Sequence, residues 1–160
     1  MIQFVNNIPG FKLANKTILI NWLKKVAQTE EKTISNLQFT FCSDAEILAI
    51  NNTYLKHNYY TDIITFDYSQ NNVLSGEIFI SIETVQSNAE LFHVKPTEEL
   101  HRVLVHGLLH LMGYKDKTKA QATEMRNKEN YFLVQLNPLL TKQPKPAVSR
   151  ETAKKTNKKK

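Results

Sequence analysis

Two periods of hydrophobic and polar residues divide the chain into predicted strands and helices. Positions 37–41 (Leu-Gln-Phe-Thr-Phe) alternate apolar and polar residues, as a half-buried strand does. We predict three further strands at 2–5, 63–68 and 76–82, which are rich in β-branched and aromatic residues. Helical spacing predicts helices from Asn15 or Thr17 to about 28, from Ser43 or Asp44 to about 54, and over 83–92. The polar positions 55–62 read as a loop, and 69–72 as a turn.

The stretch 96–113 carries the most hydrophobic of the predicted helices. Pro96 and Thr97, the predicted N-cap, precede two glutamates that suit the positive end of a helix. Apolar residues then cover most of the helical circumference, so this helix is expected to be buried and central. Gly113 follows where a left-handed C-terminal cap is expected. A last helix is predicted over about 119–135, with Pro138 ending the ordered part.

Four strands and about five helices, without strict alternation or repeats, predict an α+β fold. We expect one small mixed four-stranded sheet packed with helices, in a single domain over 1–141. Residues 142–160 hold eight of the 21 basic residues and one of the 15 acidic residues, so this segment has a net charge of +7 and residues 1–141 have −1, which together give the +6 of the chain. It has almost nothing to bury, and we predict a disordered basic tail.

The composition of the chain indicates the cellular compartment in which we expect the protein. Cys42 is the only cysteine, which excludes an intramolecular disulfide and a thiolate metal cluster. The first residues do not resemble a signal peptide, and no stretch approaches the roughly 18 apolar residues of a membrane span. We therefore expect a soluble protein of the reducing cytoplasm.

Two histidines on the central helix are the strongest chemical signal. His106 and His110 are four residues apart and lie on one helical face, and a turn after Gly113 brings Asp116 back towards them. Two imidazoles and a carboxylate predict a metal site with an open coordination position. The alternative is a pair of core histidines with satisfied hydrogen bonds. The two nearby histidines His93 and His101 read as ordinary polar residues.

Gly107 stands where the His-Glu-x-x-His metalloprotease motif has its glutamate. That glutamate is the general base of peptide hydrolysis, so the protease route has no obvious proton acceptor here. A glycine at this position also lets something approach the helix backbone closely, either a neighbouring element or a substrate.

Three motifs resemble those of the YbeY family of bacterial endoribonucleases. They are His-Gly-Leu-Leu-His-Leu-Met-Gly-Tyr at 106–114, Thr-Asp-Ile-Ile-Thr-Phe at 61–66 after Asn-Thr-Tyr at 52–54, and Gly-Glu-Ile at 76–78. The similarity covers about 45–129 in the same order. It implies a metal-dependent endoribonuclease that acts on single-stranded ribosomal RNA, in 16S rRNA 3′ end maturation and ribosome quality control, with the small ribosomal subunit as partner.

The chain departs from the family pattern at two positions. Asp116 stands where the family usually has a third histidine, and Leu55 where it usually has an arginine thought to contact RNA phosphate. A carboxylate ligand makes a bound metal a weaker Lewis acid. Zinc remains the expected divalent ion, but two histidines and one carboxylate also suit other transition metals. Lys56 could replace the charge of the missing arginine, but not its fork geometry.

The remaining candidates concern substrate binding and proton transfer. Lys56, His57 and Lys115 are candidates to position the phosphate, and Thr61 and Asp62 to line the same cleft. Either of two carboxylates, Asp62 or Glu77, could act as a base, but a structural part is the better reading of both. Lys115 and Lys117 could equally be solvated residues beside Asp116.

Two other functions stay open at this stage. One is a non-catalytic ribosome-assembly factor with a structural metal, and the other is a metal-dependent hydrolase of a non-RNA substrate. The basic tail either adds salt-sensitive attraction to RNA or only promotes solubility.

Overall fold

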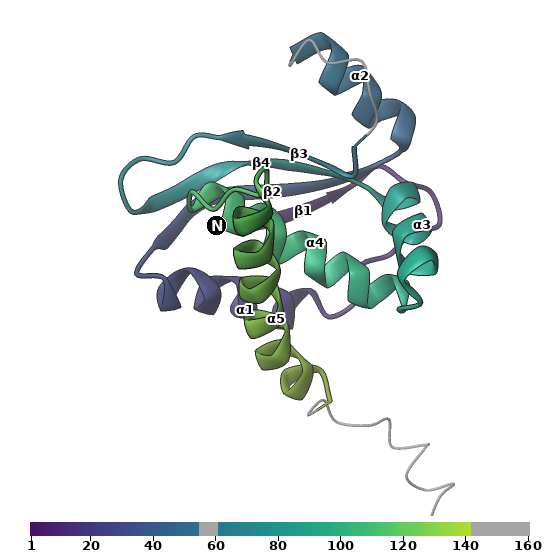
Figure 1. Ribbon diagram of the computed structural model, residues 1–160. Helices are drawn as coiled ribbons and strands as arrows, with labels where there is room; N and C mark the ends of the chain where they lie inside the picture. Colours follow the sequence, from purple (N-terminus) through teal and green to yellow (C-terminus); the bar gives the residue numbers. More distant parts are fainter. Residues whose placement is uncertain (55–60, 142–160) are drawn as a thin grey trace, which may run out of the picture.

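The computed structural model describes residues 1–54 and 61–141, which form a mixed sheet packed with helices (Figure 1). The sheet has the order β1-β2-β4-β3. Its strands are β1 (Ile2–Asn6), β2 (Thr33–Cys42), β3 (Ile63–Asp67) and β4 (Val73–Ser81). β1 and β4 run parallel to β2, and β3 runs antiparallel to β4. The predicted α+β class with a small mixed four-stranded sheet is confirmed.

Five helices surround this sheet in the described part of the chain. They are α1 (Lys16–Thr29), α2 (Asp44–Tyr54), α3 (Ile82–Phe92), α4 (Pro96–Leu111) and α5 (Lys119–Thr141). α1, α4 and α5 lie on one side of the sheet, and α2 projects from the other side (Figure 1). The main core lies between the sheet and the first group, while a small second cluster of Cys42, Ile47 and Ile64 lies under α2.

The strands β2 and β4 begin earlier than the sequence pattern predicts. They pair at Thr33 with Val73 and at Ile34 with Leu74, before an irregularity in the register. This extra length comes from pairing between the two strands, which alternation along one strand does not reveal. At the other end, Ser81 caps α3 by accepting a hydrogen bond from the Thr84 amide at 3.2 Å, so Ile82 is helical and not part of the strand.

α4 is buried nearly all round, as its composition predicts. Ten of its 16 residues are buried. The predicted N-cap was wrong: Lys95 caps the helix and its amide donates to the Glu98 carboxylate at 3.2 Å. The cap precedes Pro96 because proline, which lacks an amide hydrogen and has a fixed φ, fits the first helical position.

Gly107 allows α4 to lie directly on the sheet. A Cβ at this position would meet Cδ1 of Ile63 and Cδ1 of Ile78, each at 3.0 Å. The close neighbour foreseen for this glycine is therefore the sheet, through β3 and β4, and not a substrate.

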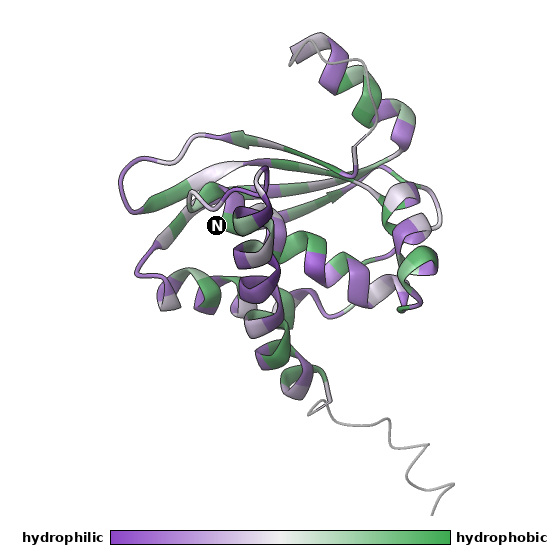
Figure 2. Cartoon of the chain, viewed as in Figure 1, coloured by the Kyte–Doolittle hydropathy of each residue, from purple (hydrophilic) through white to green (hydrophobic). Residues whose placement is uncertain are grey.

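α5 continues to Thr141, so the prediction that Pro138 ends the ordered part was wrong. Phe132 and Leu136 are fully buried, and Leu140 extends the same face four residues further. Figure 2 shows this change along α5, from hydrophilic first turns to more hydrophobic last turns. Pro138 lies on the exposed side, where its missing amide hydrogen matters least.

Residues 55–60 and 142–160 lie outside the described residues. The predicted loop at 55–62 is therefore described only from Thr61 onward, and the division into a domain over 1–141 and a disordered tail over 142–160 stays a prediction. Among the described helices, none is both long and apolar enough to span a bilayer.

Candidate metal centre

Three residues of α4 form a half-exposed stripe on an otherwise buried helix. Between Leu100 and Leu111 only Arg102, His106 and His110 are partly exposed, and they are four residues apart. The two imidazole rings lie at 80° to each other with centroids 4.5 Å apart. Their Nε2 atoms are 3.0 Å apart, so both rings direct one nitrogen to the same point.

The turn after α4 adds Asp116 to this pair. Gly113 has a φ of 103°, a left-handed conformation that side chains disfavour. The Gly113 amide donates to the carbonyl of His110 at 3.0 Å, and the Tyr114 amide donates to that of Leu109 at 3.1 Å. This pair of bonds is the Schellman motif, which reverses the chain after the helix. The glycine cap predicted from sequence is present.

The three potential ligand atoms have the spacing of a metal site. Oδ2 of Asp116 lies 3.3 Å from Nε2 of His106 and 3.4 Å from Nε2 of His110. In a tetrahedral zinc site with bonds of roughly 2.0–2.1 Å, adjacent ligand atoms lie about 3.3 Å apart. These three residues therefore fit one face of such a site, and their side chains are 21%, 27% and 39% exposed, so the open side faces solvent.

Each imidazole is held in the orientation that a metal ligand needs. Nδ1 of His106 lies 2.6 Å from Oε2 of Glu129, and Nδ1 of His110 lies 3.0 Å from the carbonyl oxygen of Tyr114. With its proton on Nδ1, each ring donates to that oxygen and leaves the Nε2 lone pair for a cation. Two lone pairs and a carboxylate oxygen at such short range favour a positive ion between them.

Glu129 is the important residue that the sequence analysis missed. It is nearly buried, with 6% of its side chain exposed, and it accepts hydrogen bonds from His106 and from Arg102, whose Nη1 is 2.8 Å away. Its signal was present in the sequence: the buried positions 125, 129, 132 and 136 of α5 form one face, and a glutamate interrupts that apolar row. An acid in such a row needs a buried partner.

The local charges favour a cation at this point. Burial works against a charged imidazole at His106, but the hydrogen bond and charge of Glu129, with Asp116 and Asp62, raise the His106 pKa above its ordinary value. Burial would also raise the pKa of Glu129, yet the hydrogen bonds from His106 and Arg102 keep it below its usual range. Burial and the neighbouring His106 lower the pKa of His110.

A second cluster of side chains holds the turn that follows α4. The Tyr114 hydroxyl donates to Oε1 of Glu30 at 2.7 Å, and Nζ of Lys128 lies 2.8 Å from Oε2 of the same carboxylate. The Lys128 ammonium also lies 5.4 Å from the centroid of the Tyr114 ring. The C-cap of α1, α5 and the turn are thus joined at Tyr114, the residue whose carbonyl orients His110.

Asp62 belongs to the surroundings of the centre, whereas Glu77 does not. A hollow of about 310 Å³ is lined by Asp62, His106, Asp116 and Glu129, among others. Burial raises the pKa of Asp62, which suits a group that exchanges protons nearer neutral pH. Glu77 instead lines a separate hollow with Tyr68. It alternates along β4 with Gly76, where a Cβ would meet Cδ2 of Leu111 in α4 at 3.3 Å, so the two positions face opposite sides of the sheet. The suggestion that Glu77 acts as a base is therefore wrong for this site.

Of the remaining candidate residues, some lie in the described part of the chain and some do not. Lys56 and His57 lie outside the described residues, so their suggested parts stay predictions. Lys115 and Lys117 are exposed, and the Thr61 hydroxyl donates to the carbonyl of Ile63 at 3.3 Å.

Two histidines and the cysteine lie apart from the three ligands. His101 is not part of the ligand cluster, in agreement with the sequence reading; it is buried on another side of α4, and burial lowers its pKa. His93 ends α3 with a φ of 59°. Burial raises the pKa of the Cys42 thiol to about 12, which keeps it protonated.

The fold and the site together define an α+β protein with a His-His-Asp cluster that could hold a metal ion at the end of a buried helix. Comparisons with known proteins show the family to which this chain belongs. The model of the endoribonuclease YbeY family matches residues 6–137. The chain belongs to the YbeY endoribonuclease family.

Individual relatives agree with this assignment. The chain is 48% identical over 126 residues to the endoribonuclease YbeY of Parabacteroides distasonis, covering 79% of this chain and 87% of that protein. It is 52% identical over 112 residues to the same enzyme of Bacteroides fragilis strain YCH46, covering 70% and 81%. The solution structure of TM1509 from Thermotoga maritima has the same fold, with a TM-score of 0.63 at 22% identity, covering 92% of this chain and 99% of that one.

Proposed function

We propose that this protein is a metal-dependent endoribonuclease that cleaves single-stranded ribosomal RNA. The observation that carries the metal part is the spacing of His106, His110 and Asp116, whose ligand atoms lie 3.0–3.4 Å apart. The RNA part is supported by the family, whose members are described as endoribonucleases. The substrate we propose is the 3′ end of 16S rRNA in the context of the small ribosomal subunit, in the cytoplasm and as part of ribosome quality control.

Zinc is the metal that we propose first. His106, His110 and Asp116 would hold it, and a divalent ion at this point would supply Lewis acidity towards a phosphoryl oxygen or a water molecule. The carboxylate of Asp116 adds a negative charge that a third imidazole would not, so other transition metals are to be tested beside zinc.

The protein side chains then have distinct tasks. Glu129 and the Tyr114 carbonyl oxygen keep the two imidazoles in the ligating tautomer. Asp62 faces the same hollow with a raised pKa, and we assign it the transfer of a proton during phosphodiester cleavage. Lys56 and His57 remain candidates to position the phosphate from the segment before Asp62.

Replacing Asp116 tests this proposal. Asp116→Ala removes one ligand from an exposed turn, so RNA cleavage should fall at least about a hundredfold while the melting temperature changes little. Asp116→His should retain the metal and restore cleavage, because it supplies the ligand usual in the family. Both variants are measured for cleavage of a 16S rRNA 3′ precursor, for metal content and for melting temperature.

The same assays separate the alternatives. A large loss of stability in Asp116→Ala without any cleavage by the unmodified, zinc-loaded protein would favour an assembly factor with a structural metal. Hydrolysis of a peptide or ester substrate in the absence of RNA cleavage would favour a different hydrolase.

Deleting residues 142–160 tests the proposed RNA attraction of the tail. Loss of seven net positive charges should weaken RNA binding and flatten its salt dependence, with metal content unchanged. An unchanged salt slope would show that the tail does not contact RNA.

A further inference from the structure

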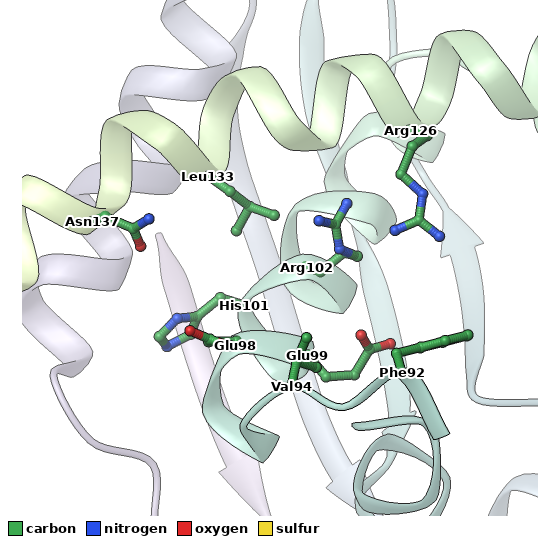
Figure 3. A pocket seen from close by; sticks show the side chains of 9 residues that line it. All are labelled: Phe92, Val94, Glu98, Glu99, His101, Arg102, Arg126, Leu133 and Asn137. Atoms are coloured by element: carbon green, nitrogen blue, oxygen red, sulfur yellow. The ribbon is translucent and has the colours of Figure 1, made fainter. Parts of the chain in front are cut away.

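A second hollow adjoins the metal centre and extends along α4 and α5. The hollow at the metal centre has a volume of about 310 Å³, and the second has about 340 Å³ and reaches Leu133 and Asn137 (Figure 3). Both are lined by Phe92, Glu99, Arg102 and Arg126. The two hollows therefore form one groove that begins beside His106 and leads away from it.

The two arginines of this groove are in different states. Arg102 is fully engaged: its Nη1 binds Glu129 at 2.8 Å and its Nη2 binds the Asn130 side chain at 2.9 Å. Arg126 is exposed and makes no hydrogen bond or ion pair with any residue in the described ranges 1–54 and 61–141. It acts on Glu99 only through its charge. A guanidinium with open donors beside a metal centre is suited to an anion.

Phe92 lies across the groove from Arg126. It is the last residue of α3, and 52% of it is exposed, although aromatic rings of this size are usually covered. Figure 3 shows the Arg126 side chain extending from α5 towards the wall that carries Phe92 and Glu99. An aromatic face and a guanidinium on opposite walls match the two parts of a nucleotide, because bases stack on aromatic rings and phosphates bind arginine forks.

The acids of the groove limit what it can hold. Glu98 and Glu99 line the outer hollow, so a row of several phosphates there would meet carboxylates. A single phosphate at Arg126 stays apart from Glu98, which lines only the outer hollow, and meets Glu99, whose pKa is raised by burial so that its negative charge is disfavoured. The carboxylate and amide oxygens further along can accept hydrogen bonds from a base.

We propose that Phe92 and Arg126 form a nucleotide subsite, which stacks the base and binds the phosphate of a nucleotide adjacent to the cleaved bond. This inference rests on the proposed function, since it names where the RNA strand leaves the metal centre. It also supplies an arginine to the RNA from α5.

The test measures binding of the full chain to a fluorescent single-stranded RNA of about ten nucleotides, with a chelator present to prevent cleavage. Arg126→Ala should weaken binding at least about fivefold and reduce the salt slope by roughly 0.7, the value for one phosphate contact in a single strand. Arg126→Lys should restore the slope but only part of the affinity, because it lacks the fork. Phe92→Ala should weaken binding by a similar factor and leave the slope unchanged.

Matched controls remove a cation and an aromatic ring outside the groove. Lys24→Ala deletes an exposed cation of α1, and Tyr131→Ala deletes an aromatic residue of α5 that is 55% exposed. Circular dichroism and melting temperature confirm that each variant folds, and Arg126→Ala alone decides the matter if Phe92→Ala does not fold. With metal restored, Arg126→Ala should raise KM for RNA and leave kcat within about twofold.

The outcomes separate the subsite from the proposed function. If the unmodified chain binds and cleaves RNA while Arg126→Ala and Phe92→Ala match their controls, the subsite is wrong and the nuclease stands. If the unmodified chain neither binds nor cleaves RNA, the proposed function is overturned and the subsite with it.

Discussion

The two faces of α4 show two different ways in which a sequence specifies a structure. The sheet face (Leu104, Gly107, Leu108 and Leu111) is buried and depends on shape, because Gly107 is just small enough for Ile63 and Ile78 to lie beside it. The metal face (Arg102, His106 and His110) is half-exposed and depends on hydrogen bonds to Glu129 of α5 and to the carbonyl of Tyr114 in the following turn. We therefore expect packing on the sheet face to control the stability of the fold, and hydrogen bonds on the metal face to control metal affinity.

The largest effect is expected from the double variant His106→Ala, His110→Ala. It removes two of the three ligands, so bound metal should become undetectable by elemental analysis and RNA cleavage should be lost. His93→Asn is the control, because it removes an imidazole at a position where asparagine tolerates the positive φ. Retention of stoichiometric metal by the double variant would rule out the proposed ligands.

On the sheet face, Gly107→Val should destabilise the fold with little effect on metal binding by the protein that remains folded. The added methyl groups would press on Ile63 and Ile78, lowering the free energy of unfolding by about 1–3 kcal/mol. Valine is a better helix former than glycine, so helix propensity alone would make Gly107→Val slightly stabilising and a loss of stability reports the packing. Chemical denaturation measures the change, and an unchanged or increased free energy of unfolding would show that α4 is not closely packed at Gly107.

On the metal face, Glu129→Gln should weaken metal binding while the fold persists. The amide oxygen can still accept the Nδ1 proton of His106, but the negative charge is lost, and zinc affinity should fall about 10–100-fold. Competition with a chromophoric chelator measures this affinity. Glu124→Gln, on the exposed side of the same helix, should be indistinguishable from the unmodified protein.

The smallest effect is expected at Glu30, which supports the turn from below. Burial opposes its charge, but the hydrogen bonds from Lys128 and Tyr114 lower its pKa. Because folding lowers this pKa, ionised Glu30 stabilises the fold at pH values above the unfolded-state pKa of about 4.5. This stabilisation is lost as the pH falls through the lower pKa of the folded state. Glu30→Gln should lose less than about 1 kcal/mol near pH 7 and show a smaller acid-induced decrease in melting temperature. An identical acid profile in both proteins would contradict this.

A feature of α4 could be predicted from the sequence when the residues that cause it are close together in the chain. The burial of α4, the C-terminal cap at Gly113 and the proximity of His106, His110 and Asp116 all arise within a few helical turns, so spacing alone reveals them. Glu129 comes from another helix, and the Tyr114 carbonyl is a backbone group without a sequence signature. Arg102 lies four residues before His106, so the same helical spacing predicts that it shares a face with the two histidines.

Errors at the ends of elements had a similar origin. The early starts of β2 and β4 depend on pairing between strands 40 residues apart, which no local pattern contains. α5 passes Pro138 because Leu136 and Leu140 still reach the core, and the proline itself faces outward. Local signals predicted a stop, and tertiary packing overrode it.

The position of Asp116 has an evolutionary consequence. Its backbone path is dictated by Gly113, and its side chain is 39% exposed beyond the end of the helix. Within residues 1–54 and 61–141 its ion-pair partners are His106 and His110, and it belongs to neither core cluster, so exchange between histidine and aspartate is open to a lineage without rebuilding the scaffold. Such an exchange alters the donor set by a full unit of charge, which makes metal preference a trait that selection can adjust through a single codon.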